Sequence, residues 1–299
     1  FGFLISFPLC PSRLRGEAFN EMSAADRWKE IVAAPEEEID LAEGALIVAA
    51  HEYPGLDVDA YRARLDEMGD TLKRRLRRDI GPTETLIAVN HYLFDELGFR
   101  GNADDYYDPR NSFLNEVLDR RLGIPITLSL VHVEIGRRAG LALHGVSFPG
   151  HFLVKCIMRN GAVVLDPYVR GASLGLEDLQ ERLKVLRHGA TPAPDMVGQM
   201  LAAAGRRSIL ARLLRNLKGI YRERKDLPRA LACADRVISL EPGAAEEYRD
   251  RAGIYFDLEC FRAALSDFRS YLMLKPGAED AAVVQRRVVE LQQIAARLN

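Results

Sequence analysis

The sequence has little net charge, few cysteines and no long apolar run, and each shortage excludes a class of protein. Its 41 Lys and Arg residues against 43 Asp and Glu residues leave a net charge of −2, which gives no electrostatic footprint for nucleic acid. No apolar run reaches the roughly 20 residues of a membrane helix. The four cysteines, Cys10, Cys156, Cys233 and Cys260, are scattered without C-x-x-C spacing. Because this usage suits a reducing compartment, we expect a cytoplasmic protein.

The chain is long enough for two domains, since 48% of its 299 residues are apolar. Its opening segment, FGFLISFPLC, is apolar but lacks the basic start and the cleavage site of a signal peptide. Met22 directly precedes a well-patterned segment, SAADRWKEIV. We therefore expect residues 1–21 to be a leader or a disordered extension that lies outside the fold.

Helical patterns fill the next part of the sequence. Pro35 and the three glutamates after it form a helix start, and apolar residues then recur at helical spacing up to Tyr53. Further helices are expected over residues 58–77 and 83–98. Because these patterns precede any strand signal, they predict a helical subregion that lies against the rest of the fold.

The middle of the sequence combines helix and strand signals. Helices are expected over residues 111–123 and 125–140, and strands over residues 143–148, 151–158 and 162–166. Asn160-Gly161 lies between the last two strands and is a strong hairpin signal. These patterns predict an α+β core with an antiparallel sheet, which together with the helical subregion spans residues 22–190.

The last part of the sequence contains an internal repeat. Six residues, Gly219, Tyr221, Ala230, Leu231, Leu240 and Pro242, recur 34 positions later as Gly253, Tyr255, Ala264, Leu265, Leu274 and Pro276. Thirty-four residues is about the period of tetratricopeptide helix pairs. We expect a linker over residues 191–205, then two repeats and a capping helix over residues 206–299. Because two repeats are few for a stable array, they should dock on the core.

Two residues of the sheet are candidates for an acid-histidine pair. His151 opens the second expected strand and Asp166 ends the third, and strand alternation puts both on one face of the sheet. A two-residue turn at Asn160-Gly161 would pair Asp166 with Lys155, which is roughly 13 Å along the strand from His151. Contact would then require a longer loop or a bulge. A structural interpretation is favoured for both residues.

A nucleophile to match this pair is missing from the sequence. A papain-like site needs a thiolate at the start of a helix, where the dipole lowers its pKa. The helix that begins at Pro125 has no cysteine, and Cys156 alternates to the face opposite His151. Only Thr127 and Ser129 offer hydroxyls in its first turn, and for them a structural role is favoured.

Patterns for metals and cofactors are also missing. His132, Glu134 and His144 lack the spacing of the H-E-x-x-H zinc motif, and the acids of residues 101–110 lack the pattern of a calcium loop. No glycine-rich phosphate loop precedes a helix. We therefore expect no metal and no cofactor.

Three segments, residues 91–99, 111–130 and 145–155, resemble the bacterial SirB family. That family joins a transglutaminase-like core to C-terminal tetratricopeptide repeats, so the resemblance implies a papain-like core, a repeat tail and a cytoplasmic location. In the wider transglutaminase motif, His151 matches the histidine, Asp166 the aspartate, and the cysteine falls near Pro125. Proline there removes the nucleophile and one amide that could bind an oxyanion.

Three functions remain open at this point. Our leading hypothesis is a non-catalytic platform that binds a protein or peptide partner, and neither a nucleic acid nor a membrane, through its repeat tail. The second is a hydrolase or acyltransferase that uses Thr127 or Ser129 as nucleophile with His151 and Asp166. The third, a regulator that contacts DNA, is weakened by the acidic balance of charge and the lack of a recognition helix.

Overall fold

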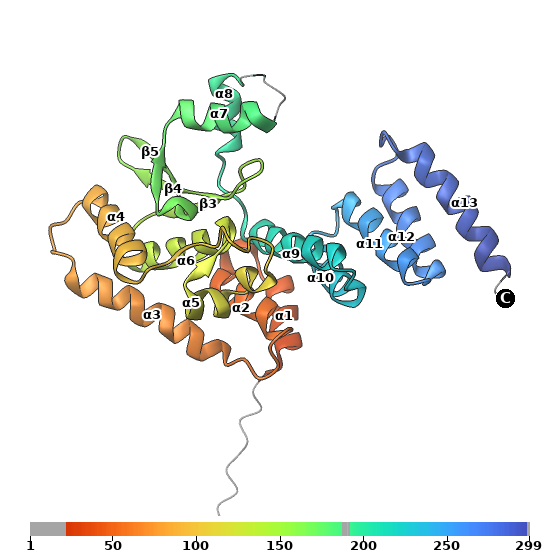
Figure 1. Ribbon diagram of the computed structural model, residues 1–299, viewed down its shortest axis with the longest axis horizontal. Helices are drawn as coiled ribbons and strands as arrows, with labels where there is room; N and C mark the ends of the chain where they lie inside the picture. Colours follow the sequence, from red (N-terminus) through yellow and green to blue (C-terminus); the bar gives the residue numbers. More distant parts are fainter. Residues whose placement is uncertain (1–21, 187–189, 191, 298–299) are drawn as a thin grey trace, which may run out of the picture.

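The protein consists of a mixed core followed by a row of paired helices (Figure 1). The structure, a computed structural model, describes residues 22–186, 190 and 192–297. The expected leader, residues 1–21, lies outside the described residues. Residues 187–189, next to the expected linker, and residue 191 within it also lie outside them. The expected fold class, an α+β transglutaminase-like core followed by an all-helical tetratricopeptide-type region, is confirmed.

Four helices open the described chain. They are α1 (Ala24–Ala33), α2 (Leu41–Ala50), α3 (Val58–Arg75) and α4 (Pro82–Asn90), and a π-helical turn, η2 (His91–Glu96), continues α4. The expected start of a helix at Pro35 is wrong: the three glutamates form a separate turn, η1 (Glu36–Glu38). The helix α2 begins only after Asp40, whose side chain accepts a hydrogen bond from the backbone N–H of Glu43 at 2.9 Å.

The next elements lead into the central helix of the core. They are β1 (Arg100–Gly101), η3 (Pro109–Ser112), α5 (Leu114–Arg120), β2 (Leu122–Gly123) and α6 (Pro125–Arg138). The two short strands pair in parallel, with Gly101 opposite Gly123. Proline suits the first position of α6 because that N–H has no partner within a helix. Nearly all of α6 is buried, as its largely apolar sequence predicts.

An antiparallel sheet lies on α6, in the order β3 (Leu143–Val146), β4 (Leu153–Met158), β5 (Gly161–Asp166) and β6 (Ala172–Leu174). Alternate residues of the sheet, such as Val154 and Leu165, join the main hydrophobic cluster beneath it. The intervening residues, such as Leu153 and Val164, pack against α7 (Leu176–Leu186) and α8 (Pro194–Met200) on the other face (Figure 1). The helix α8 lies inside the segment 191–205 that we expected to be a linker.

The register of the β4–β5 hairpin differs from the expected one by two residues. Met158 pairs with Gly161, so the two turn residues are Arg159 and Asn160. Gly161, which we expected in the turn, opens β5 with φ of +139°, a value that favours glycine. The pairing of Val154 with Leu165 then sets Asp166 beside the start of β4. No bulge or longer loop is needed to bring it near His151.

The repeat region consists of five helices, α9 (Arg206–Glu223), α10 (Leu227–Leu240), α11 (Ala245–Asp257), α12 (Phe261–Leu274) and α13 (Ala281–Arg297). The turn inside each helix pair contains one residue with positive φ, Lys225 in the first pair and Glu259 in the second, 34 positions apart. The equivalence of the two turns agrees with the repeat that the sequence indicates.

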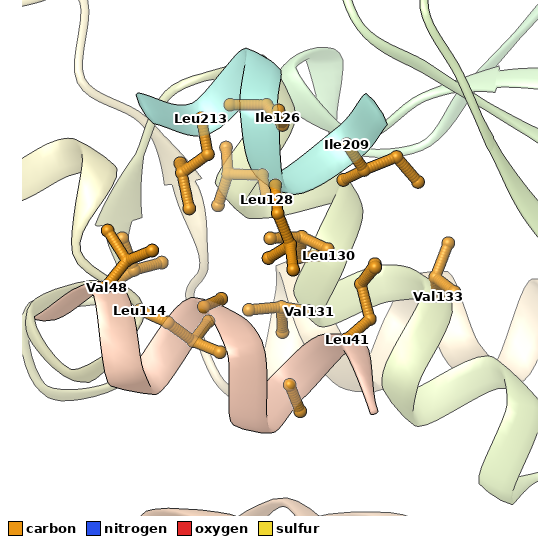
Figure 2. Close-up of a cluster of buried hydrophobic side chains, with 14 of the residues drawn as sticks. Leu41, Val48, Leu114, Ile126, Leu128, Leu130, Val131, Val133, Ile209 and Leu213 are labelled. Atoms are coloured by element: carbon orange, nitrogen blue, oxygen red, sulfur yellow. The ribbon is translucent and has the colours of Figure 1, made fainter. Parts of the chain in front are cut away.

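The first helix pair shares the hydrophobic core with the N-terminal part of the chain. Figure 2 shows side chains from α2, α6 and α9 meeting in one buried cluster. The approach of α9 to α2 is so close that a Cβ atom on Gly44 would lie 2.7 Å from a methyl carbon of Leu210. By contrast, the helices α11, α12 and α13 form a hydrophobic cluster of their own. The expected docking of the repeats therefore involves the first pair.

Candidate functional site

The candidate site lies at the end of the sheet where β4 begins and β5 ends. His151 follows a turn in which Gly150 has a φ of +68°. The backbone N–H of His151 donates to the carbonyl oxygen of Phe148 at 3.1 Å. The Nε2 atom of His151 lies 2.9 Å from Oδ1 of Asp166. The acid is fully buried, and the imidazole side chain is 20% exposed. The structure thus brings together the two residues that the sequence proposed as a pair, and leaves the imidazole open to solvent on one side.

Asp166 is held by three donors. Its Oδ1 atom also accepts from the backbone N–H of Tyr168 at 3.1 Å, and its Oδ2 atom lies 2.8 Å from Nη2 of Arg182 on α7. Burial by itself raises the pKa of Asp166, but hydrogen bonds and charge from His151 and Arg182 outweigh burial, so the pKa lies below its ordinary value. The carboxylate is therefore ionised at neutral pH, and Nε2 of His151 carries the proton that it donates to Asp166.

The first repeat helix also supports the loop before β4. Arg212 of α9 donates to the carbonyl oxygen of His151 at 2.6 Å and to that of Phe148 at 3.2 Å. Its guanidinium lies 5.4 Å from the centre of the Phe152 ring. The position of His151 thus depends on the repeat region as well as on the sheet, a dependence that the sequence pattern did not reveal.

Tyr168 connects the imidazole to the strands that lead into α6. It belongs to the 3-10 turn η4 (Pro167–Val169), and its ring meets His151 edge-on with centroids 6.1 Å apart. The same ring packs so closely on Gly101 that a Cβ atom there would lie 2.4 Å from it. Gly101 pairs with Gly123, two residues before the first residue of α6. An aromatic ring thus packs against both the histidine and the strand pair at the start of this helix.

Neither hydroxyl in the first turn of α6 is open to a substrate. Thr127 is fully buried, and its Oγ1 atom donates to the carbonyl oxygen of Asn111 at 2.7 Å and accepts from the N–H of Ile124 at 3.1 Å. Ser129 is also fully buried, and its Oγ atom has no hydrogen-bond partner. Thr127 therefore caps the helix and connects it to η3. The hydroxyl of Ser129, by contrast, forms no hydrogen bond that would give it a structural role.

None of the three described cysteines can replace the missing thiol at His151. Cys156 is buried in β4 on the face that packs on α6, and burial raises its pKa. Cys233 is buried in α10, where burial raises its pKa to about 12. Cys260 is exposed next to α12, in the separate second helix pair. Thiols with a raised pKa are protonated at neutral pH and react slowly.

A pocket that the sequence did not predict lies where the core meets the repeat region. It has a volume of about 220 Å³ and is lined by Tyr106, Tyr107 and Ile124 of the core and by α9 residues that include Arg215, Gly219 and Glu223. We call it the junction pocket. Tyr106 is 40% exposed and Tyr107 62% exposed. The adjacent tyrosines and a repeat glycine were visible in the sequence, but only the docking of α9 brings them together.

Within residues 22–186 and 192–297, no cluster of three or more His, Cys, Asp or Glu residues is arranged to hold a metal ion. No helix in the same part of the chain has the length and apolar character to cross a membrane.

Comparison with known families agrees with this architecture. A transglutaminase-like superfamily model matches residues 59–215, and a tetratricopeptide repeat model matches residues 217–288. The first match includes the His151–Asp166 pair and covers more than half of the chain, so the chain belongs to the transglutaminase-like superfamily. The second match covers most of the paired helices after the core.

Among curated proteins, the chain is similar to UPF0162 proteins of bacteria. It is 40% identical to the UPF0162 protein of Xylella fastidiosa strain Temecula1 over 265 residues, which are 88% of this chain and 94% of the relative. It is 32% identical to a UPF0162 protein of Pseudomonas aeruginosa over 251 residues, 84% of this chain and 90% of the relative. A third of the chain is similar to human F-box only protein 21, with 37% identity over 106 residues that make up 17% of that protein.

Proposed function

We propose that this protein is a non-catalytic interaction platform, in which a degenerate transglutaminase-like core supports a repeat region that captures a protein or peptide partner. The observation that carries the proposal is the lack of a reactive nucleophile beside His151 among the described residues. The start of α6 offers Pro125 and two buried hydroxyls, and the three described thiols lie elsewhere. As part of the same proposal, we assign the protein to the SirB family and to the cytoplasm.

The junction pocket is our candidate anchor point for the partner. Tetratricopeptide repeats generally bind peptides or helices, and a few buried side chains carry most of the energy of such interfaces. Exposed tyrosines are enriched in binding sites because the ring packs while the hydroxyl forms hydrogen bonds. The pocket combines Tyr106 and Tyr107 with the polar face of the first repeat helix. It has room for one medium-sized side chain of a partner.

A matched pair of glycine substitutions tests this proposal. Gly219 lines the junction pocket, and a Cβ atom there would meet no atom within 4 Å, so Gly219→Phe fills the pocket without disturbing the helix. Gly253 occupies the equivalent position 34 residues later and has the same free space. We expect Gly219→Phe to lower the amount of a specific partner captured from lysate at least tenfold, and Gly253→Phe to leave it unchanged. Equal capture by both variants would contradict the anchor point.

The enzymatic alternative makes a different prediction. A hydrolase or acyltransferase that uses Thr127 or Ser129 should be labelled at one of these residues by a fluorophosphonate probe, and His151→Ala should abolish the labelling. The platform predicts no labelling at either residue and unchanged partner capture by His151→Ala. Mass spectrometry of the labelled, folded protein distinguishes the two, and His151-dependent labelling would replace our proposal by the alternative.

A further inference from the structure

A second cavity lies between α6, β3 and the start of α9, apart from the junction pocket. Its volume is about 220 Å³, and we call it the α6–β3 cleft. Apolar side chains from three helices form much of its wall, and Figure 2 shows four of them, Leu41, Leu130, Val133 and Ile209, on one side of the buried cluster. Phe152 of the sheet completes the apolar surface. The proposed platform function makes no use of this cleft.

The wall of the cleft contains an unsatisfied hydroxyl. Ser129 lines the cleft, is fully buried, and its Oγ atom forms no hydrogen bond with any described residue. A buried polar group without a partner costs roughly 1–3 kcal/mol, so such groups are rare in folded proteins. A helical serine can usually bond the carbonyl oxygen one turn earlier, but this one does not. The hydroxyl is therefore an unpaired donor in the wall of the cleft, and a ligand that bonds it must displace the side chains that cover it from solvent.

The mouth of the cleft is positively charged. Arg137 and Arg206 line it together with His144, and none of the described lining residues is acidic. Arg206 donates to the carbonyl oxygen of Ile39 at 2.6 Å, which fixes its position. Among the described residues, the guanidinium of Arg137 has no ion-pair or hydrogen-bond partner.

Glu38, Asp40 and Glu134 line a neighbouring pocket together with Arg137 and Arg206, so they offset part of this charge, but two of the three acids have cationic partners of their own. Glu134, one turn before Arg138 on α6, pairs with Arg138 at 2.5 Å. Asp40 pairs with Arg62 at 2.9 Å. Burial and the positive charges of Lys155 and Arg137 lower the pKa of His144, which agrees with a positive potential at the mouth.

We propose that the α6–β3 cleft binds a small organic acid with an apolar body. The carboxylate pairs with Arg137 and Arg206 at the mouth, the body packs on Leu130, Val133 and Phe152, and a polar group of the ligand reaches the hydroxyl of Ser129. Arginine suits this role because its guanidinium matches the geometry of a carboxylate. The volume lies below the roughly 300–1,000 Å³ of sites for drug-sized ligands, which favours a ligand of about ten non-hydrogen atoms or fewer.

Three probes with the same chain length test the chemistry of the cleft. Hexanoate carries the proposed charge, 1-hexanol carries none and hexylamine carries the opposite one. With the full chain, calorimetry or ligand-detected NMR should give one hexanoate site with an affinity at least tenfold above that for hexanol, and no hexylamine binding. A tenfold difference corresponds to about 1.4 kcal/mol of binding free energy. Equal affinity for all three probes would overturn the proposal.

Substitutions locate the site. Arg137→Gln should weaken hexanoate binding at least tenfold, and Ser129→Ala should weaken binding of 6-hydroxyhexanoate more than binding of hexanoate. Arg269→Gln, at an exposed position of α12 in the separate helix cluster, is the control that removes the same charge away from the cleft and should change nothing. Unchanged hexanoate affinity in a folded Arg137→Gln protein would refute the assignment. Because none of the three residues lines the junction pocket, partner capture should be the same in all three variants. The outcome of this test is therefore independent of the platform proposal.

Discussion

Nε2 of His151 lies 2.9 Å from Oδ1 of Asp166, and Nη2 of Arg182 lies 2.8 Å from the other oxygen of the same carboxylate. The carboxylate is fully buried and joins three segments: the start of β4, the end of β5 and the helix α7. A buried carboxylate is stable only when its oxygens are paired. The acid-histidine geometry therefore has a structural function in this chain whether or not the imidazole takes part in a reaction.

Asp166→Asn tests that structural function. The substitution removes the charge that pairs with His151 and Arg182, and breaking a buried ion pair typically costs 3–5 kcal/mol. We expect the free energy of unfolding at pH 7, measured by urea denaturation, to fall by about 3 kcal/mol. Glu177→Gln, an exposed change in the first turn of α7, should alter it by less than about 0.5 kcal/mol. A loss below about 1 kcal/mol for Asp166→Asn would show that the pair contributes little to stability.

Alkylation of cysteines tests for an activated thiol. Cys156 and Cys233 are buried with pKa values raised by burial, whereas Cys260 is exposed. Only thiolates react with iodoacetamide at an appreciable rate. At pH 7.5, the folded chain should be labelled at Cys260, and labelling of Cys156 and Cys233 should require urea. Rapid labelling of Cys156 in the folded state, quantified by peptide mass spectrometry, would contradict the burial of this thiol and weaken the non-catalytic proposal.

The sequence predicted the fold class because its signals are local and periodic. The expected strands, the helix that begins at Pro125 and the 34-residue repeat all correspond to observed elements. The sequence alone does not determine the register of the hairpin, because it does not show which two residues form the turn. The strongest hairpin signal predicts a turn at Asn160-Gly161, whereas the structure uses Arg159 and Asn160. Because the pairing is shifted by two residues, His151 and Asp166 lie within hydrogen-bond distance, whereas the expected register would have separated them.

Other features of the site depend on packing between distant segments. The sequence gives no sign that Arg182 of α7 completes the pairing of Asp166, or that Arg212 of α9 holds the loop before β4. Tyr168 lies in the turn after β5, and its contact with Gly101 crosses more than 60 residues. Such contacts follow from the docking of whole elements, which local patterns do not determine.

Truncation of the repeat region should have different effects at its two natural boundaries. The apolar residues of α9, such as Leu210 and Leu213, are fully buried in the main core, whereas α11, α12 and α13 mostly bury a cluster of their own and add Ile254 to the main core. A chain that ends at Gly243 should therefore stay folded, and a chain that ends at Gly205 should expose the core and aggregate. Circular dichroism and size-exclusion chromatography distinguish these outcomes. A folded, monomeric chain ending at Gly205 would show that α9 is not needed to cover the core.

His132 should make the protein sensitive to acid. The residue is fully buried in α6, its Nε2 atom donates to Oδ1 of Asn90 at 2.8 Å, and its ring stacks on Phe94 with centroids 5.9 Å apart. Burial lowers the pKa of His132 from 6.5 to about 4. Between these two values the unfolded chain binds more protons than the folded one, so the free energy of unfolding falls as the pH drops from 6.5 to 4.

The size of this effect can be measured against a non-titrating variant. At about 1.4 kcal/mol per pKa unit, His132 should remove about 3 kcal/mol of stability over that pH range. His132→Gln keeps a donor for Asn90 but cannot be protonated, so its urea-unfolding free energy should depend less steeply on pH by this amount. If wild type and His132→Gln have the same slope between pH 6.5 and 4, the imidazole is protonated in the folded state, and water must reach this part of α6.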